Sequence, residues 1–252
     1  DLQKQQDQIN NIILKNTHQT LVFFNNGSSG DVRFDPCLAT SWEFIDDTHI
    51  EMKLRDDVYF NDGAQTPMTA EDVKFTLDMA MDNMVASVLA GYVGCTVKDE
   101  HTIEIEIEKY NNEFVQSLAS LPLAIQSKKA YDDGVEDPFY IGTGPYKFDE
   151  WVEGEYCRLV KVEDYWGNHI PAGENLAPGV AEILEFRPYI EASSRVMALQ
   201  AGEIDVCVNP PINELQYLEE DKNITVYEQT GTRLFYFAFN VEKAPWDNQT
   251  LR

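Results

Sequence analysis

The stretch Leu38–Met81 constrains the fold of this chain more than any other part of it. Within it, Ser41–Phe44 and His49–Arg55 alternate apolar and polar residues, which is typical of strands with one buried face. The polar pair Asp46-Asp47 lies between them and suits a tight turn, because an Asp side chain accepts hydrogen bonds from nearby backbone N–H groups. This pattern predicts an antiparallel hairpin.

A second turn and a helix follow this hairpin. In Asn61-Asp62-Gly63 the glycine can adopt a positive φ without steric cost. Thr69 is expected to cap the next helix, with Asp72 three residues later, as in a capping box that has Asp in place of Glu. One face of that helix carries Val73, Phe75, Thr76, Met79 and Ala80. We therefore expect the helix to pack against the hairpin through this face.

The rest of the chain mixes both kinds of element. Helical patterns cover residues 2–15, 112–120, 128–134, 193–201 and 211–219. Strand patterns cover residues 21–24, 94–97, 102–108, 146–152, 156–162, 183–188, 204–208, 224–228 and 234–239. Strands and helices interleave without strict alternation, which predicts an α/β (mixed α+β) fold with both hairpins and crossovers.

The charge of the chain excludes one class of partner. Its 19 basic and 44 acidic residues give a formal net charge of −25. Phosphate binding needs a basic patch, so we expect no nucleic-acid partner. The longest apolar run, Leu234–Phe239, is far shorter than the roughly 20 residues of a membrane-spanning helix. Asp1 opens directly in a polar stretch, so no signal peptide is expected at the start of this sequence; an exported lipoprotein would carry a leader and a lipid-modified cysteine upstream.

Catalytic and metal-site patterns are missing from the sequence. There is no Gly-x-Ser-x-Gly, the four histidines lie in no triad context, and no Cys-x-x-Cys occurs among the four cysteines. Gly142-Thr143-Gly144 begins like a phosphate-binding fingerprint, but Lys147 replaces its third glycine, so these glycines are expected to serve backbone geometry. We expect free buried thiols, no catalytic residue, no metal ligand and no cofactor.

The order of these segments resembles a known family. From Leu38 the chain reads L-A-x-S-W, a charged hairpin, L-R-D-x-V-x-F-x-D-G and T-A-E-D-V-x-F-x-L. Three later blocks agree: Gly142–Phe148 with Trp151 and Asp164–Gly167; Met197–Val206; and Phe239–Asn240 with Pro245–Asn248 and Leu251–Arg252. Together they resemble the family 5 solute-binding proteins, the periplasmic or surface-anchored receptors that supply peptides, nickel chelates and some sugars to ABC importers.

The resemblance implies a fold and a place in the cell. It implies a periplasmic-binding-protein-like type II lobe, with a main α/β subdomain at about 1–44 and 171–252 and an inserted β-rich subdomain at about 45–170. A second lobe would lie outside residues 1–252. The implied protein is a monomer that is not an enzyme, located in the periplasm or lipid-anchored at the extracellular face of the membrane, with an ABC permease as partner.

The resemblance also implies where the solute lies, which is between the two lobes. Carried over by position, the first contact segment is His18, Gln19 and Thr20, where a turn leading into a strand is the structural alternative. Gln19 falls where oligopeptide receptors carry a carboxylate, so charge pairing with a peptide amine stays open at that point.

A second contact segment lies between two expected strands and consists of Gln229, Thr230, Gly231, Thr232 and Arg233. Gly231 would let backbone groups approach an extended ligand, as strand addition to a peptide requires, and an ordinary hairpin loop is the alternative. We expect a peptide as the solute. A nickel chelate or an oligosaccharide, or an acidic surface module that binds a protein partner, are the other functions left open.

Overall fold

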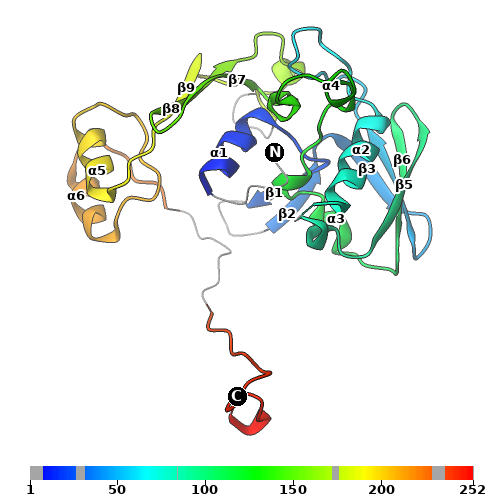
Figure 1. Cartoon of the computed structure of the whole chain (residues 1–252). Helices are drawn as coiled ribbons and strands as arrows, with labels where there is room; N and C mark the ends of the chain where they lie inside the picture. The colour runs from blue at the N-terminus through cyan, green and yellow to red at the C-terminus, as the bar shows by residue number, and fades with distance from the viewer. Residues whose placement is uncertain (1–7, 27–31, 84, 172–175, 229–235, 252) are drawn as a thin grey trace. The chain divides into compact units, whose positions relative to one another are not determined.

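The structure is a computed structural model that describes residues 8–26, 32–83, 85–171, 176–228 and 236–251. The chain forms two compact units, Asp1–Ile190 and Glu191–Arg252, and each is described by itself (Figure 1). The predicted division into a main subdomain and an inserted one remains a prediction.

A four-stranded antiparallel sheet forms the largest element of the first unit. Its strands are β3 (Ala39–Phe44), β4 (His49–Leu54), β5 (Tyr92–Asp99) and β6 (Thr102–Ile107), in the order β3-β4-β6-β5. The predicted hairpin is confirmed. Asp46 Oδ1 accepts hydrogen bonds from the backbone N–H groups of Thr48 (2.7 Å) and His49 (2.8 Å), which closes the turn. The alternating isoleucines of β6 are buried, as predicted.

Helix α2 (Ala70–Met81) covers one face of this sheet, and its capping box is confirmed. Asp72 Oδ2 accepts hydrogen bonds from the N–H (2.8 Å) and the hydroxyl (3.0 Å) of Thr69. The predicted packing face was partly wrong, because Leu77 is buried while Phe75 and Met79 are half-buried. The helix packs chiefly on β5 and β6 rather than on the β3–β4 hairpin, since the later strands complete the sheet beneath it (Figure 1).

Shorter elements fill the rest of this side of the unit. Helix α1 (Gln8–Thr17) leads into β1 (Val22–Asn26), which pairs antiparallel with β2 (Val32–Pro36). Two short helices follow the sheet, α3 (Phe114–Ser117) and α4 (Lys128–Asp132). The 3-10 segments are η2 (Ala86–Leu89), η3 (Leu121–Leu123), η4 (Pro138–Tyr140) and η5 (Trp166–His169).

A three-stranded antiparallel sheet ends the first unit. Its strands are β7 (Tyr146–Val152), β8 (Tyr156–Lys161) and β9 (Ile183–Phe186), in sequence order. The predicted β7–β8 hairpin is confirmed. At its turn Gly154 adopts a φ of +78°, a backbone conformation that residues with a side chain rarely adopt. Helix α1 packs against β7, so the N-terminal segment lies beside this sheet (Figure 1).

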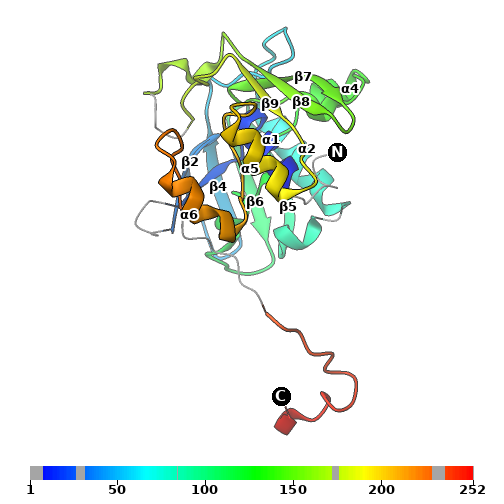
Figure 2. The ribbon, with the colours of Figure 1, turned by 90° about the vertical axis from the view of Figure 1, so that its left-hand side faces the viewer.

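Within the described residues of the second unit, the regular elements are helices. Helix α5 (Ala192–Gln200) and helix α6 (Leu215–Glu220) lie next to each other in two views (Figures 1 and 2), with 3-10 segments η6 (Ile212–Glu214) and η7 (Gln249–Leu251). The strands predicted at 204–208 and 224–228 were wrong, and 236–239 is not a strand either; Leu234 and Phe235 lie outside the described residues. Val206, Tyr227 and Phe237 are 75%, 90% and 96% exposed. An apolar alternating segment becomes a strand only where another strand accepts its backbone hydrogen bonds.

Among the described residues, no helix is both long and apolar enough to span a bilayer. The four cysteines are free thiols, two of them, Cys37 and Cys95, buried and two, Cys157 and Cys207, half-buried.

Candidate ligand-binding site

The first predicted contact segment lies at the junction between α1 and β1. His18, Gln19 and Thr20 are 3%, 7% and 5% exposed, so their side chains point into the first unit. The segment is also held by its backbone, since Gln19 O accepts the N–H of Ile125 (3.0 Å) and Thr20 O accepts the N–H of Leu38 (3.2 Å). The three residues therefore form a fixed part of the unit's interior.

His18 is a neutral, buried imidazole. Its Nδ1 lies 2.8 Å from Thr17 Oγ1, and its Nε2 has no hydrogen bond of normal geometry to any described residue. Burial lowers the pKa of His18 to about 4, and the nearby Phe139 backbone only partly opposes this shift. The side chain consequently carries no charge at neutral pH and cannot pair with an anionic ligand there.

Gln19 takes part in a long-range hydrogen bond. Its Nε2 donates to the hydroxyl of Tyr165 (2.6 Å), and that hydroxyl donates to the carbonyl of Leu176 (3.0 Å). Burial raises the pKa of Tyr165, so the phenol keeps its proton. Thr20 is satisfied locally, because its hydroxyl donates to Val22 O (2.7 Å).

The Gly142-Thr143-Gly144 turn packs directly on the end of α1. A Cβ atom at Gly142 would lie 2.0 Å from Thr17 O, and one at Gly144 would lie 2.6 Å from Asn16 O. Gly144 N–H donates to Thr17 O (2.9 Å). These glycines serve close backbone packing, as the sequence predicted, because no larger residue fits between the two segments.

Trp166 joins the glycine turn to the end of the first hairpin. Its Nε1 donates to Thr143 O (2.9 Å), and the Arg55 guanidinium lies 4.7 Å from its ring centroid. Arg55 in turn donates to both carboxylate oxygens of Asp57, at 2.8 Å and 2.7 Å. We call the group His18, Gln19, Gly142, Tyr165 and Trp166 the polar junction.

Sequence reasoning found the members of the polar junction but not their pairing. The 142–148 and 164–167 blocks indicate the family resemblance, and the positions of His18 and Gln19 within that resemblance predict them as contact residues. Gln19 and Tyr165 are 146 positions apart, and no local pattern links them. The second predicted contact segment, Gln229, Thr230, Gly231, Thr232 and Arg233, lies outside the described residues.

The described part of the chain contains no group of three or more His, Cys, Asp or Glu side chains placed to hold a metal ion. Three carboxylates in acidic pairs of the sequence have local roles instead. Asp46 closes a turn, Asp57 pairs with Arg55, and Asp132 pairs with Lys128 one helical turn away. Each of these three carboxylates thus has a local structural partner, and none of these contacts indicates a catalytic role.

Comparison with known proteins gives the arrangement a context. The family model described as "Bacterial extracellular solute-binding proteins, family 5 Middle" matches residues 33–252. The glutathione-binding protein GsiB of Escherichia coli strain K12 is 28% identical over 255 residues, which cover 98% of this chain and 47% of that protein. The chain thus spans about half the length of the curated relatives it matches.

Solved structures agree with the sequence matches. The periplasmic binding protein DppA of Helicobacter pylori, in complex with the peptide STSA, superimposes with a TM-score of 0.74 at 26% identity, over 88% of this chain and 46% of that one. A nickel ABC transporter protein of Bacillus halodurans gives a TM-score of 0.69 at 26% identity, over 84% and 41%. The mixed α/β architecture described above is therefore that of periplasmic binding proteins.

Proposed function

Because this chain belongs to the family 5 bacterial extracellular solute-binding proteins, we propose that it is the first lobe of a peptide receptor that serves an ABC importer. The observation that carries the proposal is the family match over residues 33–252, which covers most of the first unit and all of the second. The family comprises binding proteins, and Gln19 Nε2, the Tyr165 hydroxyl and Trp166 Nε1 are engaged in structural contacts, so we propose no enzymatic activity.

Two relatives support a peptide as the solute. One is a glutathione-binding protein, and glutathione is itself a tripeptide; the structure of the other is a complex with the peptide STSA. The nickel protein supports a metal chelate as the second candidate. The described residues contain no ligand cluster for a bare metal ion, so a bound metal would have to arrive as a chelate with its own ligands.

In the proposed mechanism, the solute bridges two lobes and stabilises their closed state, which the permease then recognises. His18–Thr20 and Gln229–Arg233 form this lobe's contact with the solute. Because the three residues of the first segment are buried and the Gln19 and Thr20 carbonyls already accept hydrogen bonds within the unit, we propose that the peptide contacts only the small exposed part of this segment. The full-length protein would act in the periplasm or at the extracellular face of the membrane, on a lipid anchor.

Calorimetry on two proteins tests the proposal. The full-length protein and residues 1–252 alone are each titrated with Ser-Thr-Ser-Ala, reduced glutathione and nickel–histidine. We expect the full-length protein to bind a peptide probe, and the fragment to bind it at least about 100-fold more weakly, because each 1.4 kcal/mol of lost contacts costs tenfold.

Three results would contradict parts of the proposal. Equal affinity of the fragment and the full-length protein would contradict closure between two lobes. Binding of nickel–histidine alone would replace the peptide with a chelate. Binding of no probe, with retained affinity for a permease or another protein partner, would favour an acidic protein-binding module.

A further inference from the structure

The segment Asp164–Gly167 reaches three separate parts of the first unit. Tyr165 contacts Gln19 through its hydroxyl, and Trp166 contacts Thr143 O through its indole N–H. The Trp166 ring also lies under Arg55. The two aromatic residues are 3% and 9% exposed, so these contacts are made in the interior.

Gly167 fixes where the Tyr165 ring lies. A Cβ atom at Gly167 would approach Tyr165 Cε1 to 2.4 Å and Leu176 O to 2.6 Å, so the ring occupies the space a side chain would need. The Leu176 carbonyl, which accepts the Tyr165 proton, is part of the same contact. The phenol is thus held on one side by glycine and on the other by its hydrogen bond.

This arrangement determines the direction of the bond to Gln19. A carbonyl oxygen can only accept, so the single proton of Tyr165 goes to Leu176 O, and toward Gln19 the phenol oxygen must accept. The Gln19 amide therefore turns its Nε2 toward Tyr165. Within the described residues, Tyr165 is the hydrogen-bond partner through which the Gln19 side chain is oriented, since Gln19 Oε1 has none.

We infer that Tyr165 is a positioning residue for the solute-contact segment His18–Thr20, and that it acts through the Gln19 amide. The inference rests on the proposed function, because that function assigns the segment to the solute. Gln19 is 7% exposed and its amide donates to Tyr165 in the interior, so it orients the segment rather than touching the solute through its side chain. Tyr165 acts on the binding site without being part of it.

The test compares two tyrosines in the full-length protein. Tyr165→Phe removes the hydroxyl that accepts from Gln19. Tyr92→Phe is the matched control, because the Tyr92 hydroxyl donates to Asp78 Oδ1 (2.7 Å) between β5 and α2, and Tyr92 is also buried. Amide hydrogen exchange is followed in peptides that cover residues 17–21, without any ligand, together with thermal unfolding.

Tyr165→Phe removes two hydrogen bonds, of which only the one from Gln19 reaches the segment. We expect it to speed exchange across 17–21 by about tenfold, the factor that matches loss of that one buried bond. Tyr92→Phe should leave 17–21 unchanged. If Tyr165→Phe does not fold, Gln19→Met removes the same bond from its other end. The inference is overturned if exchange at 17–21 in the Tyr165 variant equals that of wild type, or if the two tyrosine variants change it equally.

A second arm connects the bond to binding. Affinity for Ser-Thr-Ser-Ala or reduced glutathione should fall about tenfold in Tyr165→Phe and less than about twofold in Tyr92→Phe. The double variant Gln19→Met/Tyr165→Phe should bind no more weakly than Tyr165→Phe alone, since both substitutions remove the same hydrogen bond between Gln19 and Tyr165. If wild type binds neither probe, the proposed function fails, while the exchange data still decide whether Tyr165 positions the segment.

Discussion

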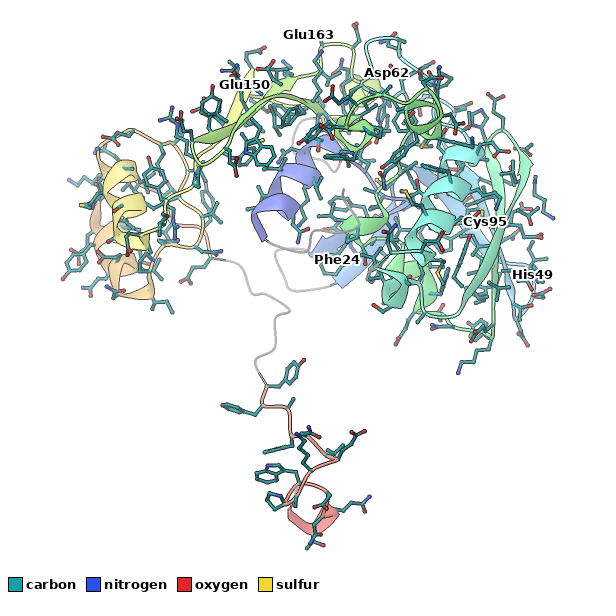
Figure 3. All side chains as sticks on the ribbon, in the orientation of Figure 1. Phe24, His49, Asp62, Cys95, Glu150 and Glu163 are labelled. Atoms are coloured by element: carbon teal, nitrogen blue, oxygen red, sulfur yellow. The ribbon has the colours of Figure 1, made fainter. Side chains whose placement is uncertain are left out.

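The polar junction and the outer face of the four-stranded sheet are both rich in polar groups, yet they differ in what those groups contribute. On the outer face, Glu43, Glu51 and Glu104 stand side by side on β3, β4 and β6. Glu51 pairs with Lys53 on the same strand, and Glu104 pairs with Lys98 of the neighbouring strand β5. His49 lies on this face, away from α2 (Figure 3), whereas Cys95 faces the helix. In the polar junction every side chain is buried.

The comparison shows that burial decides the value of a polar contact. An ion pair on the solvent-exposed face, such as Lys98–Glu104, contributes little to folding stability, because solvent and salt screen both charges. In the junction, losing one partner leaves the other buried and unpaired, which costs about 1–3 kcal/mol. A substitution in the junction should therefore cost more than the same kind of substitution on the outer face.

Gly142→Ala should break the junction with the largest effect. The added methyl group would lie 2.0 Å from Thr17 O, a backbone atom that cannot move without shifting α1. We expect a loss of about 3 kcal/mol or more of unfolding free energy by chemical denaturation. Gly94→Ala on β5 is the control, since nothing lies within 4 Å of its added Cβ, and it should stay within about 1 kcal/mol of wild type. Equal losses would remove the distinction between the two regions.

The contributions of His18 and His49 to folding stability should change with pH in opposite directions. The pKa of His18 is about 4 in the folded chain against 6.5 ordinarily, so the unfolded chain takes up a proton first as pH falls. Stability should drop by about 3 kcal/mol between pH 6.5 and pH 4 on this account. His18→Gln should flatten that slope. An unchanged slope in the variant would show that other groups cause the acid sensitivity.

His49 provides the opposite case on the outer face. The hydrogen bond that His49 Nδ1 donates to the Asp46 carboxylate raises the pKa of His49. The hydrogen bond from the Thr48 backbone N–H, followed by the one from His49, lowers the pKa of Asp46 to about 2. The His49 contribution is complete below pH 6.5 and is lost as pH rises through the raised pKa. The Asp46 contribution is present above its ordinary 3.8 and is lost as pH falls toward about 2. Proton NMR should show His49 titrating above 6.5 and His18 near 4.

Trp166→Phe should have a smaller effect than Gly142→Ala. It leaves the Thr143 carbonyl without its indole donor while an aromatic ring stays beneath Arg55. We expect a loss of about 2 kcal/mol in thermal or chemical unfolding. A loss below about 0.5 kcal/mol would mean that the junction tolerates an unpaired carbonyl, which contradicts the expected cost of a buried unpaired polar group.

Lys98→Gln should be the mildest change. It removes the ion pair with Glu104 (2.9 Å) on the solvent-exposed face. The unfolding free energy should change by less than about 0.5 kcal/mol, and the difference should vanish at high salt. A loss comparable to that of Trp166→Phe would show that the outer face carries stability after all.

Some elements of this fold can be predicted from short sequence segments, and others cannot. The Asp46 turn, the Thr69–Asp72 capping box and the alternating strand β6 depend on residues within a few positions of each other, and all three are confirmed. The packing face of α2 depends on strands that come later in the chain, so its prediction missed Leu77. The strands predicted at 204–208 and 224–228 have the right alternation but no partner strand in the described part of the second unit.

The site divides in the same way. Position within the resembled family led to His18, Gln19 and Thr20, while their burial and the bond between Gln19 and Tyr165 required the folded chain. No periodicity or motif encodes a contact between residues 146 positions apart. The polar junction was therefore out of reach of local sequence reasoning, although every one of its residues lies in a segment that the sequence had singled out.

Mass spectrometry of the full-length protein tests the central proposal most directly. The purified protein is measured under native conditions, before and after exposure to a peptide mixture, and the released ligand is then sequenced. We predict that the native protein carries a mass excess that resolves into peptides on denaturation. A bound nickel chelate or sugar, or a protein that stays unliganded after the peptide mixture, would contradict the assignment of this chain to a peptide receptor.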